Sequence, residues 1–332
     1  MSHGKGDAKK VVIAALAGNL AIAACKFFAA YMTGSTATLA EAVHSLADTS
    51  NQGLLLVGMM LAARAANEMH PFGRASERYF WPFVVALMLF SVGGAFAVYE
   101  GVHKLIHPEA ASGSPWWSIG VLGTSLIFES MSFAVAFREF KKIRGSQGYV
   151  AAIAHARDPT IPLVLMEDTT ALFGLVVALI AVVLSALTHN PIFDSIGSVL
   201  IGLVLCAAAA VIGIQTHGLL IGESATPEMR REVVKAAQGT PGVRRVTQLL
   251  TLHLGPDDVV GALKVSFESG STVEQVEEII NEMERRIRQQ VPAMSKLFIE
   301  ADSQGDLRGV VTDEHGPASR RVSSAEVKEP GA

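Results

Sequence analysis

Six long apolar stretches constrain the fold of this 332-residue chain more than any other feature. A helix that crosses a membrane needs about 20 mostly apolar residues, because the hydrocarbon core is about 30 Å thick. Hydrophobic residues make up 50% of the chain and charged residues only 17%, an unusual balance for a soluble domain of this size. The sequence therefore predicts an all-α membrane domain of six transmembrane helices, at residues 11–32, 38–63, 80–103, 116–137, 160–187 and 192–221.

The distribution of positive charge predicts the orientation of these helices. Lys and Arg gather before the first stretch, between the second and third, and between the fourth and fifth, whereas the connections at 32–37 and 188–191 have none. Because positive loops stay in the cytoplasm, we expect both termini there, with residues 1–10 as a cytoplasmic N-terminus. We expect a multi-pass protein of a bacterial inner (cell) membrane. The net charge of −4 gives no sign of a nucleic-acid partner.

The pattern changes after residue 221 and predicts a small cytoplasmic domain over residues 222–305. Thr226 followed by Pro227 is typical of a helix start, and Ser271 or Thr272 would begin a second, amphipathic helix. Three alternating segments lie around these helices and read as strands. The predicted order α-β-β-α-β makes an open-faced α+β domain. Residues 306–332 are polar, and we expect a disordered tail.

Polar residues interrupt the second apolar stretch at helical spacing. Glu41, His44, Asp48 and Asn51 are three, four and three residues apart, which places them on one helix face. A charged group in the hydrocarbon costs about 2.5–3.5 kcal/mol even on mild insertion scales, so this face must turn toward partners or water. We interpret the stripe as functional, with Glu41 near the outer mouth and Asn51 orienting Asp48.

A metal site is the sharper hypothesis. His44 and Asp48 lie one helical turn apart, so an imidazole nitrogen and a carboxylate oxygen can converge on one ion. The fifth stretch supplies Asp168 at a similar depth, and acids from two helices would repel unless a cation or proton lay between them. Glu167 points about 100° away from Asp168 and would be a fourth ligand, a base beside the site, or a partner for another helix. We predict His44, Asp48 and Asp168, with Glu167, as metal-binding residues.

These motifs together resemble one family, the cation diffusion facilitators. The resemblance covers residues 8–303 and includes the stretch GSTATLAEAVHSLADTSNQ, HPFGRASERYFW at 70–81, FDSIGSVLIG at 193–202 and LHLGPDD at 252–258. It implies export of Zn²⁺ or a related divalent ion in exchange for protons, by alternating access in a homodimer. The adjacent Glu167 and Asp168 resemble the branch of an animal organellar zinc transporter.

Several residues depart from the family pattern. Val164 stands where many zinc-carrying members place a His, so Mn²⁺, Fe²⁺, Co²⁺ and Ni²⁺ remain alternatives to Zn²⁺. In the loop after the second helix, Arg74 would repel a metal, and we expect His70 to be a hydrogen-bonded loop residue.

Two further expectations come from the resemblance. Glu223 is expected to pair with Arg74 or Arg78, unless it is a solvated surface acid. In the C-terminal domain a paired zinc site is not expected, although a single weak site at His253 and Asp302 is possible; the domain's main role would be dimerisation.

The prediction from sequence is a proton-coupled antiporter, most simply for Zn²⁺, with no resident cofactor and with the metal ion, protons, the lipid bilayer and a second copy of the chain as partners. A less favoured alternative is an intramembrane metalloenzyme with Glu167 as base, although no HExxH motif is present. A passive cation channel is a third alternative, and the lack of a repeated ring of charges argues against it.

Overall fold

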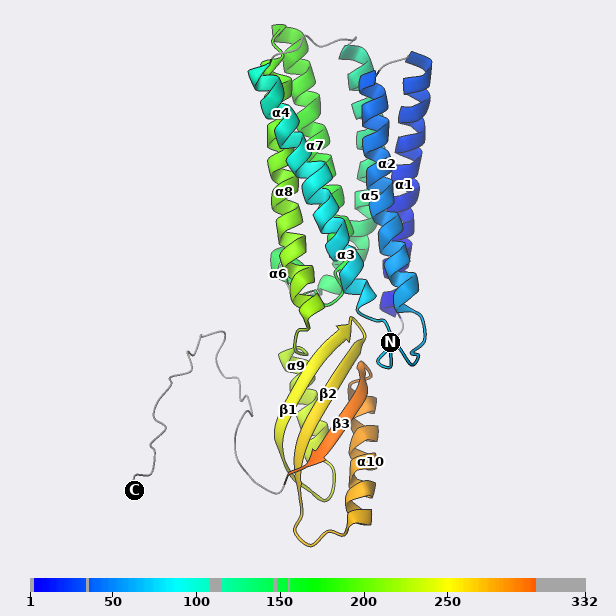
Figure 1. The fold of residues 1–332 in the computed structure, drawn as a ribbon, viewed down its shortest axis with the longest axis vertical. Coiled ribbons are helices and arrows are strands. Elements are labelled where there is room, and N and C mark those ends of the chain that lie inside the picture. The colour runs from blue at the N-terminus through cyan, green and yellow to red at the C-terminus, as the bar shows by residue number, and fades with distance from the viewer. Residues whose placement is uncertain (1–2, 34–35, 108–114, 146–147, 155, 303–332) are drawn as a thin grey trace, which may run out of the picture. The chain divides into compact units, whose positions relative to one another are not determined.

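The computed structural model describes residues 3–33, 36–107, 115–145, 148–154 and 156–302, and the predicted tail at 306–332 lies outside them (Figure 1). Within these ranges the N-terminal part of the chain, up to Ile221, consists of helices and their connections. Its elements are α1 (His3–Thr33), α2 (Thr36–Ala62), α3 (Glu77–Met88), the π-helical stretch η1 (Leu89–Ala95), α4 (Phe96–Ile106), α5 (Pro115–Arg144), α6 (Tyr149–Ala154), α7 (Thr160–Thr188) and α8 (Ile192–Ile221).

Five of the described helical segments are long and apolar enough to cross a membrane. They are Val11–Phe28, Glu77–Ile106, Ser118–Arg144, Thr160–Thr188 and Ile192–Ile221. The remaining predicted stretch, the second one at 38–63, corresponds to α2, whose 27 residues include the polar stripe. At a rise of about 1.5 Å per residue, α2 is long enough to cross the hydrocarbon core. The protein is a multi-pass integral membrane protein.

The third predicted helix is interrupted by the π-helical stretch η1, which the apolar pattern did not indicate. Here two glycines allow a close approach between η1 and α8: a Cβ added to Gly94 would lie 2.5 Å from the Cys206 sulfur, and one added to Gly202 would lie 2.7 Å from the Gly94 carbonyl oxygen. Small residues let membrane helices pack at short range. The widened turn of η1 therefore occurs where α3 and α4 are pressed against α8.

The helices pack so that α1 contacts α2 and α5, and α5 contacts α7. Where α1 and α7 begin and α2 and α5 end, these helices share an apolar cluster of buried side chains: Val11, Val12, Ala15, Leu55, Ala136, Phe140, Ile161, Leu163 and Val164. Each of these nine side chains, called the end cluster below, has at most 4% of its surface exposed. The end cluster fixes the depth at which the polar residues further along the same helices meet.

The C-terminal part contains α9 (Pro227–Gln238), β1 (Val243–Gly255), β2 (Asp258–Phe267), α10 (Val273–Gln290) and β3 (Met294–Ala301), with sheet order β1-β2-β3. The helix starts agree with prediction: the Thr226 hydroxyl accepts from the Met229 N–H, and Thr272 forms a capping box with Gln275. The predicted α-β-β-α-β order is confirmed.

The chain forms two compact units. One contains the described part of residues 1–225 with 251–260 and 293–296, and the other contains the rest of the described C-terminal residues.

Candidate transport site

Two adjacent acids of α7, Glu167 and Asp168, are buried, with 6% and 1% of their surface exposed. Because neighbouring helical residues point about 100° apart, the two carboxylates face different helices. Glu167 faces α2: its Oε1 accepts from Asn51 Nδ2 at 3.0 Å and its Oε2 from Gln52 Nε2 at 2.9 Å. Asp168 faces α5, where its Oδ2 accepts from the Ser132 hydroxyl at 2.9 Å. The pair therefore joins α7 to both neighbours.

The polar face of α2 contacts α7 about one turn further along α2 than the predicted ligand Asp48. Asn51, predicted to orient Asp48, instead donates to Glu167. Gln52, which is not part of the predicted polar stripe, is 0% exposed and also accepts a hydrogen bond from Asn19 Nδ2 at 3.1 Å. Asp48 lies one turn toward the start of α2 and is half-buried. Position 44 is within α2, but the side chain of His44, like that of Glu41, lies outside the described residues.

Two buried oxygen atoms in this region have no hydrogen-bond partner among the described residues: Asp168 Oδ1 and Asn51 Oδ1. An unsatisfied buried acceptor costs about 1–3 kcal/mol, so such atoms usually mark a place where a proton, water or ion binds. Carboxylate and amide oxygens are suitable ligands for divalent cations. The donor set present therefore fits a metal ion as cargo.

The described acids of the predicted site interact electrostatically, but they do not form one coordination sphere. Glu167 interacts electrostatically with Asp48 and Asp168. Within the described residues, no three His, Cys, Asp or Glu side chains are close enough to hold one metal ion. The side chain of His44 lies outside the described residues, so this statement does not include it. The structure thus places Asp48, Glu167 and Asp168 in one polar region, and their coordination of a common ion remains a prediction.

One end of this polar region is sealed by the apolar end cluster. Val164, one turn before Asp168, is fully buried there. A His at this position would have to place a polar ring among apolar side chains, which explains why the departure from the family pattern is compatible with the fold. Asp48, on the other side of the acids, is only half-buried.

Sequence reasoning missed two buried ionisable residues near the acids, Glu129 on α5 and Lys26 on α1, each 6% exposed. Glu129 interacts electrostatically with Asp168 and Asp48, and also with Lys26. The signal was present: each residue lies inside a stretch predicted to cross the membrane, where a charged group is rarely placed without a function. The long apolar runs on either side masked both residues.

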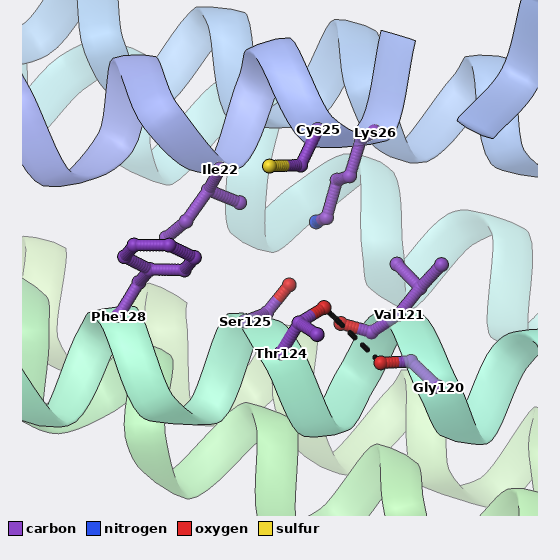
Figure 2. Close-up of a pocket in the computed structure, with 8 residues that line it drawn as sticks. All are labelled: Ile22, Cys25, Lys26, Gly120, Val121, Thr124, Ser125 and Phe128. Atoms are coloured by element: carbon purple, nitrogen blue, oxygen red, sulfur yellow. Dashed lines mark hydrogen bonds between the residues drawn. The ribbon is translucent and has the colours of Figure 1, made fainter. Parts of the chain in front are cut away.

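A cavity of about 330 Å³ lies between α1 and α5 (Figure 2). Its lining is mostly apolar, and Lys26 crosses it from α1 with its ammonium group directed toward α5, where Thr124 and Ser125 lie (Figure 2). Cys25, a free cysteine, lines the same cavity.

Ion pairs at the connections differ from the predicted ones. Glu223 pairs with Arg157, in the segment before α7, so the expected pairing with Arg74 or Arg78 is wrong. Arg78 instead pairs with Asp158. Residues 157 and 158 are adjacent, so one short segment forms ion pairs both with the start of α3 and with the residue that follows α8 by two positions. Sequence distance gave no indication of this, because Arg157 is 66 residues from its partner.

The loop before α3 agrees with expectation. The backbone N–H of His70 donates to the Asn67 side chain at 2.8 Å, and its ring lies 3.4 Å from Arg74 Nη2. His70 is therefore a hydrogen-bonded loop residue beside a cation, as the sequence indicated.

The two C-terminal residues considered for a weak site have separate partners. His253 is buried, and its Nδ1 lies 3.2 Å from the Gly255 carbonyl oxygen. Burial lowers the pKa of His253 below its usual value. Asp302 accepts a hydrogen bond from the Thr247 hydroxyl at 2.8 Å. Among the described residues these side chains are not part of a metal-holding group.

Comparison with known protein families decides the identity of the fold. A model described as the cation efflux transmembrane domain matches residues 12–218, and one described as the cation efflux protein cytoplasmic domain matches residues 225–304. The chain belongs to the cation efflux family. This confirms the resemblance to the cation diffusion facilitators seen in the sequence. The matched transmembrane domain includes α2, which carries the polar stripe, and α7, which carries the pair of acids.

Three relatives illustrate the range of the family. The mitochondrial proton-coupled zinc antiporter SLC30A9 of Xenopus laevis is 33% identical over 80% of this chain and 47% of its own length. Metal tolerance protein C4 of Arabidopsis thaliana is 28% identical, over 90% of this chain and 64% of its own. Magnetosome protein MamB of Paramagnetospirillum magneticum is 26% identical, over 79% and 82% respectively.

The chain spans about half the length of the SLC30A9 antiporters that it matches. Among solved structures, a nickel form of the MamM C-terminal domain is 24% identical, with a TM-score of 0.23, and covers 24% of this chain and 99% of its own.

Proposed function

We propose that this cation efflux protein is a proton-coupled antiporter that exports a divalent metal ion, with Zn²⁺ as the first candidate. The observation that supports it most strongly is Asp168, which is 1% exposed inside a membrane-spanning helix and retains one buried oxygen without a partner. A carboxylate in that position is costly unless a cation or a proton occupies it during the cycle. The names of the similar SLC30A9 proteins favour zinc and proton coupling.

The proposed ligands are His44 and Asp48 from α2 and Asp168 from α7. Ser132 fixes one oxygen of Asp168 and leaves the other free to bind. Glu167 is the fourth residue of the predicted set and its third acid. The amides of Asn51 and Gln52 hold both of its oxygens, so its first effect is to position α7 against α2.

Exchange follows from competition for the same groups. A metal ion binds imidazole and carboxylate in their deprotonated forms, so binding from the cytoplasm releases protons. Rocking of the helices then exposes the ion on the far side, where protons displace it. The apolar end cluster closes one route to the acids, as an alternating-access cycle requires at each stage. An inward proton gradient would drive net export.

The membrane and the assembly are part of the proposal. We propose that both termini face the cytoplasm of a bacterial inner membrane, that residues 11–221 form the transport domain, and that residues 222–305 join two copies into a homodimer. The match of residues 225–304 to the cation efflux cytoplasmic domain supports the last step. The exposed side chains of Leu250 and Phe298 on β1 and β3 are apolar surface that a second copy would cover.

The test is a metal panel in proteoliposomes that contain a pH-sensitive dye. Wild-type protein is expected to move Zn²⁺ and protons in a fixed ratio, and Mn²⁺, Fe²⁺, Co²⁺ and Ni²⁺ are compared under identical gradients. Asp48→Ala and Asp168→Ala should abolish both fluxes. Glu139→Gln is the matched control, because Glu139 pairs with Lys142 near the end of α5. Normal transport by either aspartate variant would refute the site.

A further inference from the structure

We propose that Glu129 of α5 is a cation-binding carboxylate of the transport site, so that three helices rather than two supply acids to the metal ion. The proposal rests on the proposed function, because it adds a ligand to the site that transports the divalent cation. It concerns a residue that the motif of α2 and the acid pair of α7 do not include.

The position of Glu129 on α5 is the first observation. Glu129 lies three residues before Ser132, and residues three apart share a helix face. Ser132 donates to Asp168, so this face of α5 is turned toward the acid of α7. Ser125, four residues before Glu129, is also buried. The spacing of four and three residues gives α5 a polar stripe of the same kind as that of α2.

The electrostatic surroundings of Glu129 are the second observation. Three charged residues on three other helices act on it electrostatically: Asp168 of α7, Asp48 of α2 and Lys26 of α1. Carboxylates outnumber the single lysine in this group. Negative charges that share a poorly solvated region repel, and a divalent cation between them removes that repulsion. The arrangement therefore favours a doubly charged cation over a monovalent one.

The third observation is which oxygens are available to bind an ion. Glu167 already accepts from two amides, and Val164 has no ligating atom. Asp168 Oδ1 is buried without a partner among the described residues, and Asp168, Asp48 and Lys26 act on Glu129 electrostatically. Glu129 is therefore better placed than Glu167 to supply the missing fourth ligand beside His44, Asp48 and Asp168.

Binding requires a movement. The described acids are too far apart to form one coordination sphere as they stand. A cation would draw α5 toward α2 and α7, and the helix displacements of alternating access are large enough to supply such an approach. Closure of three helices around the ion would couple binding to the conformational change. With one nitrogen and three carboxylate donors, the site would accept Zn²⁺, Co²⁺ and Mn²⁺ and would bind softer ions less well.

The experiment measures Zn²⁺ binding to the full-length protein in detergent by calorimetry, together with the melting temperature with and without the metal. Glu129→Gln keeps the size of the side chain and removes its charge. It should lower Zn²⁺ affinity at least tenfold, and should raise the melting temperature without metal because repulsion among the acids is relieved. Glu129→Asp, which retains the charge on a shorter side chain, should bind with intermediate affinity. Glu139→Gln, on the same helix, should match wild type.

Metal-edge X-ray absorption supplies a second readout that a structural role would not change. Zn²⁺ bound to wild type should show four light-atom ligands including three carboxylates, and Glu129→Gln should lose one carboxylate. Affinity within twofold of wild type in a folded Glu129→Gln or Glu129→Asp protein would overturn the proposal, as would a lower melting temperature with unchanged affinity. If Asp168→Ala also bound Zn²⁺ normally, the proposed function would fall as well; if Asp168→Ala lost binding, only the role of Glu129 would fall.

Discussion

The contact between Gln52 and Glu167 gives a quantitative test of how α2 and α7 are joined. Gln52 is completely buried, donates to Glu167 at 2.9 Å and accepts from Asn19 at 3.1 Å. Gln52→Leu keeps the volume and removes both hydrogen bonds. Such bonds between membrane helices contribute on average about 0.6 kcal/mol and at most about 1.7 kcal/mol each. The substitution should therefore destabilise the folded protein by about 1–3 kcal/mol.

A double-mutant cycle isolates the part of this cost that belongs to the Gln52–Glu167 pair. Gln52→Leu, Glu167→Gln and the double variant would be unfolded by titration with SDS, with Ser50→Ala as control because that exposed hydroxyl bonds to the Leu46 carbonyl of its own helix. We expect a coupling free energy of about 0.6–1.7 kcal/mol. Additive effects within about 0.5 kcal/mol would refute the reasoning, because the two side chains would then not depend on each other.

Three other predictions follow from single contacts. Ser132→Ala removes the donor to Asp168 Oδ2 and should weaken Zn²⁺ binding by about 10–100-fold in calorimetry, as loss of a hydrogen bond to a metal ligand usually does; unchanged binding would argue against Asp168 as ligand. The lowered pKa of His253 means that the unfolded chain takes up its proton first, so stability should fall as pH drops below about 6.5, and His253→Gln should flatten that part of the melting-temperature profile. Thr226→Ala removes the cap of α9 and should cost about 1 kcal/mol, measured by chemical unfolding against wild type.

The sequence predicted the helices well because their positions depend on local composition. Each of the six apolar stretches corresponds to a helical segment, and α8 has the predicted limits, Ile192–Ile221. The caps at Thr226 and Thr272 were likewise readable, since a cap requires only a few neighbouring residues. The π-helical stretch η1 was not predictable in this way, because it coincides with a tertiary contact, the close approach of Gly94 to α8.

The candidate site was predictable only in part, because it depends on contacts between helices that are distant in the sequence. The spacing of α2 indicated which face turns inward, but it gave no information on which residue of α7 each side chain would meet. Asn51 therefore bonds to Glu167, 116 positions away, instead of orienting Asp48. Glu129 and Lys26 were overlooked because each is a single charge in a long apolar run, and their significance appears only when α1, α5 and α7 are packed together.

The central claim is that metal and proton compete for one set of buried acids, and counter-transport in proteoliposomes tests it most directly. An imposed proton gradient should drive Zn²⁺ against its own concentration gradient in wild type, with a proportional proton flux in the opposite direction. Asp168→Asn should abolish both fluxes, while Glu139→Gln should leave both intact. Zn²⁺ movement that does not respond to the proton gradient, or that persists in Asp168→Asn, would contradict the account.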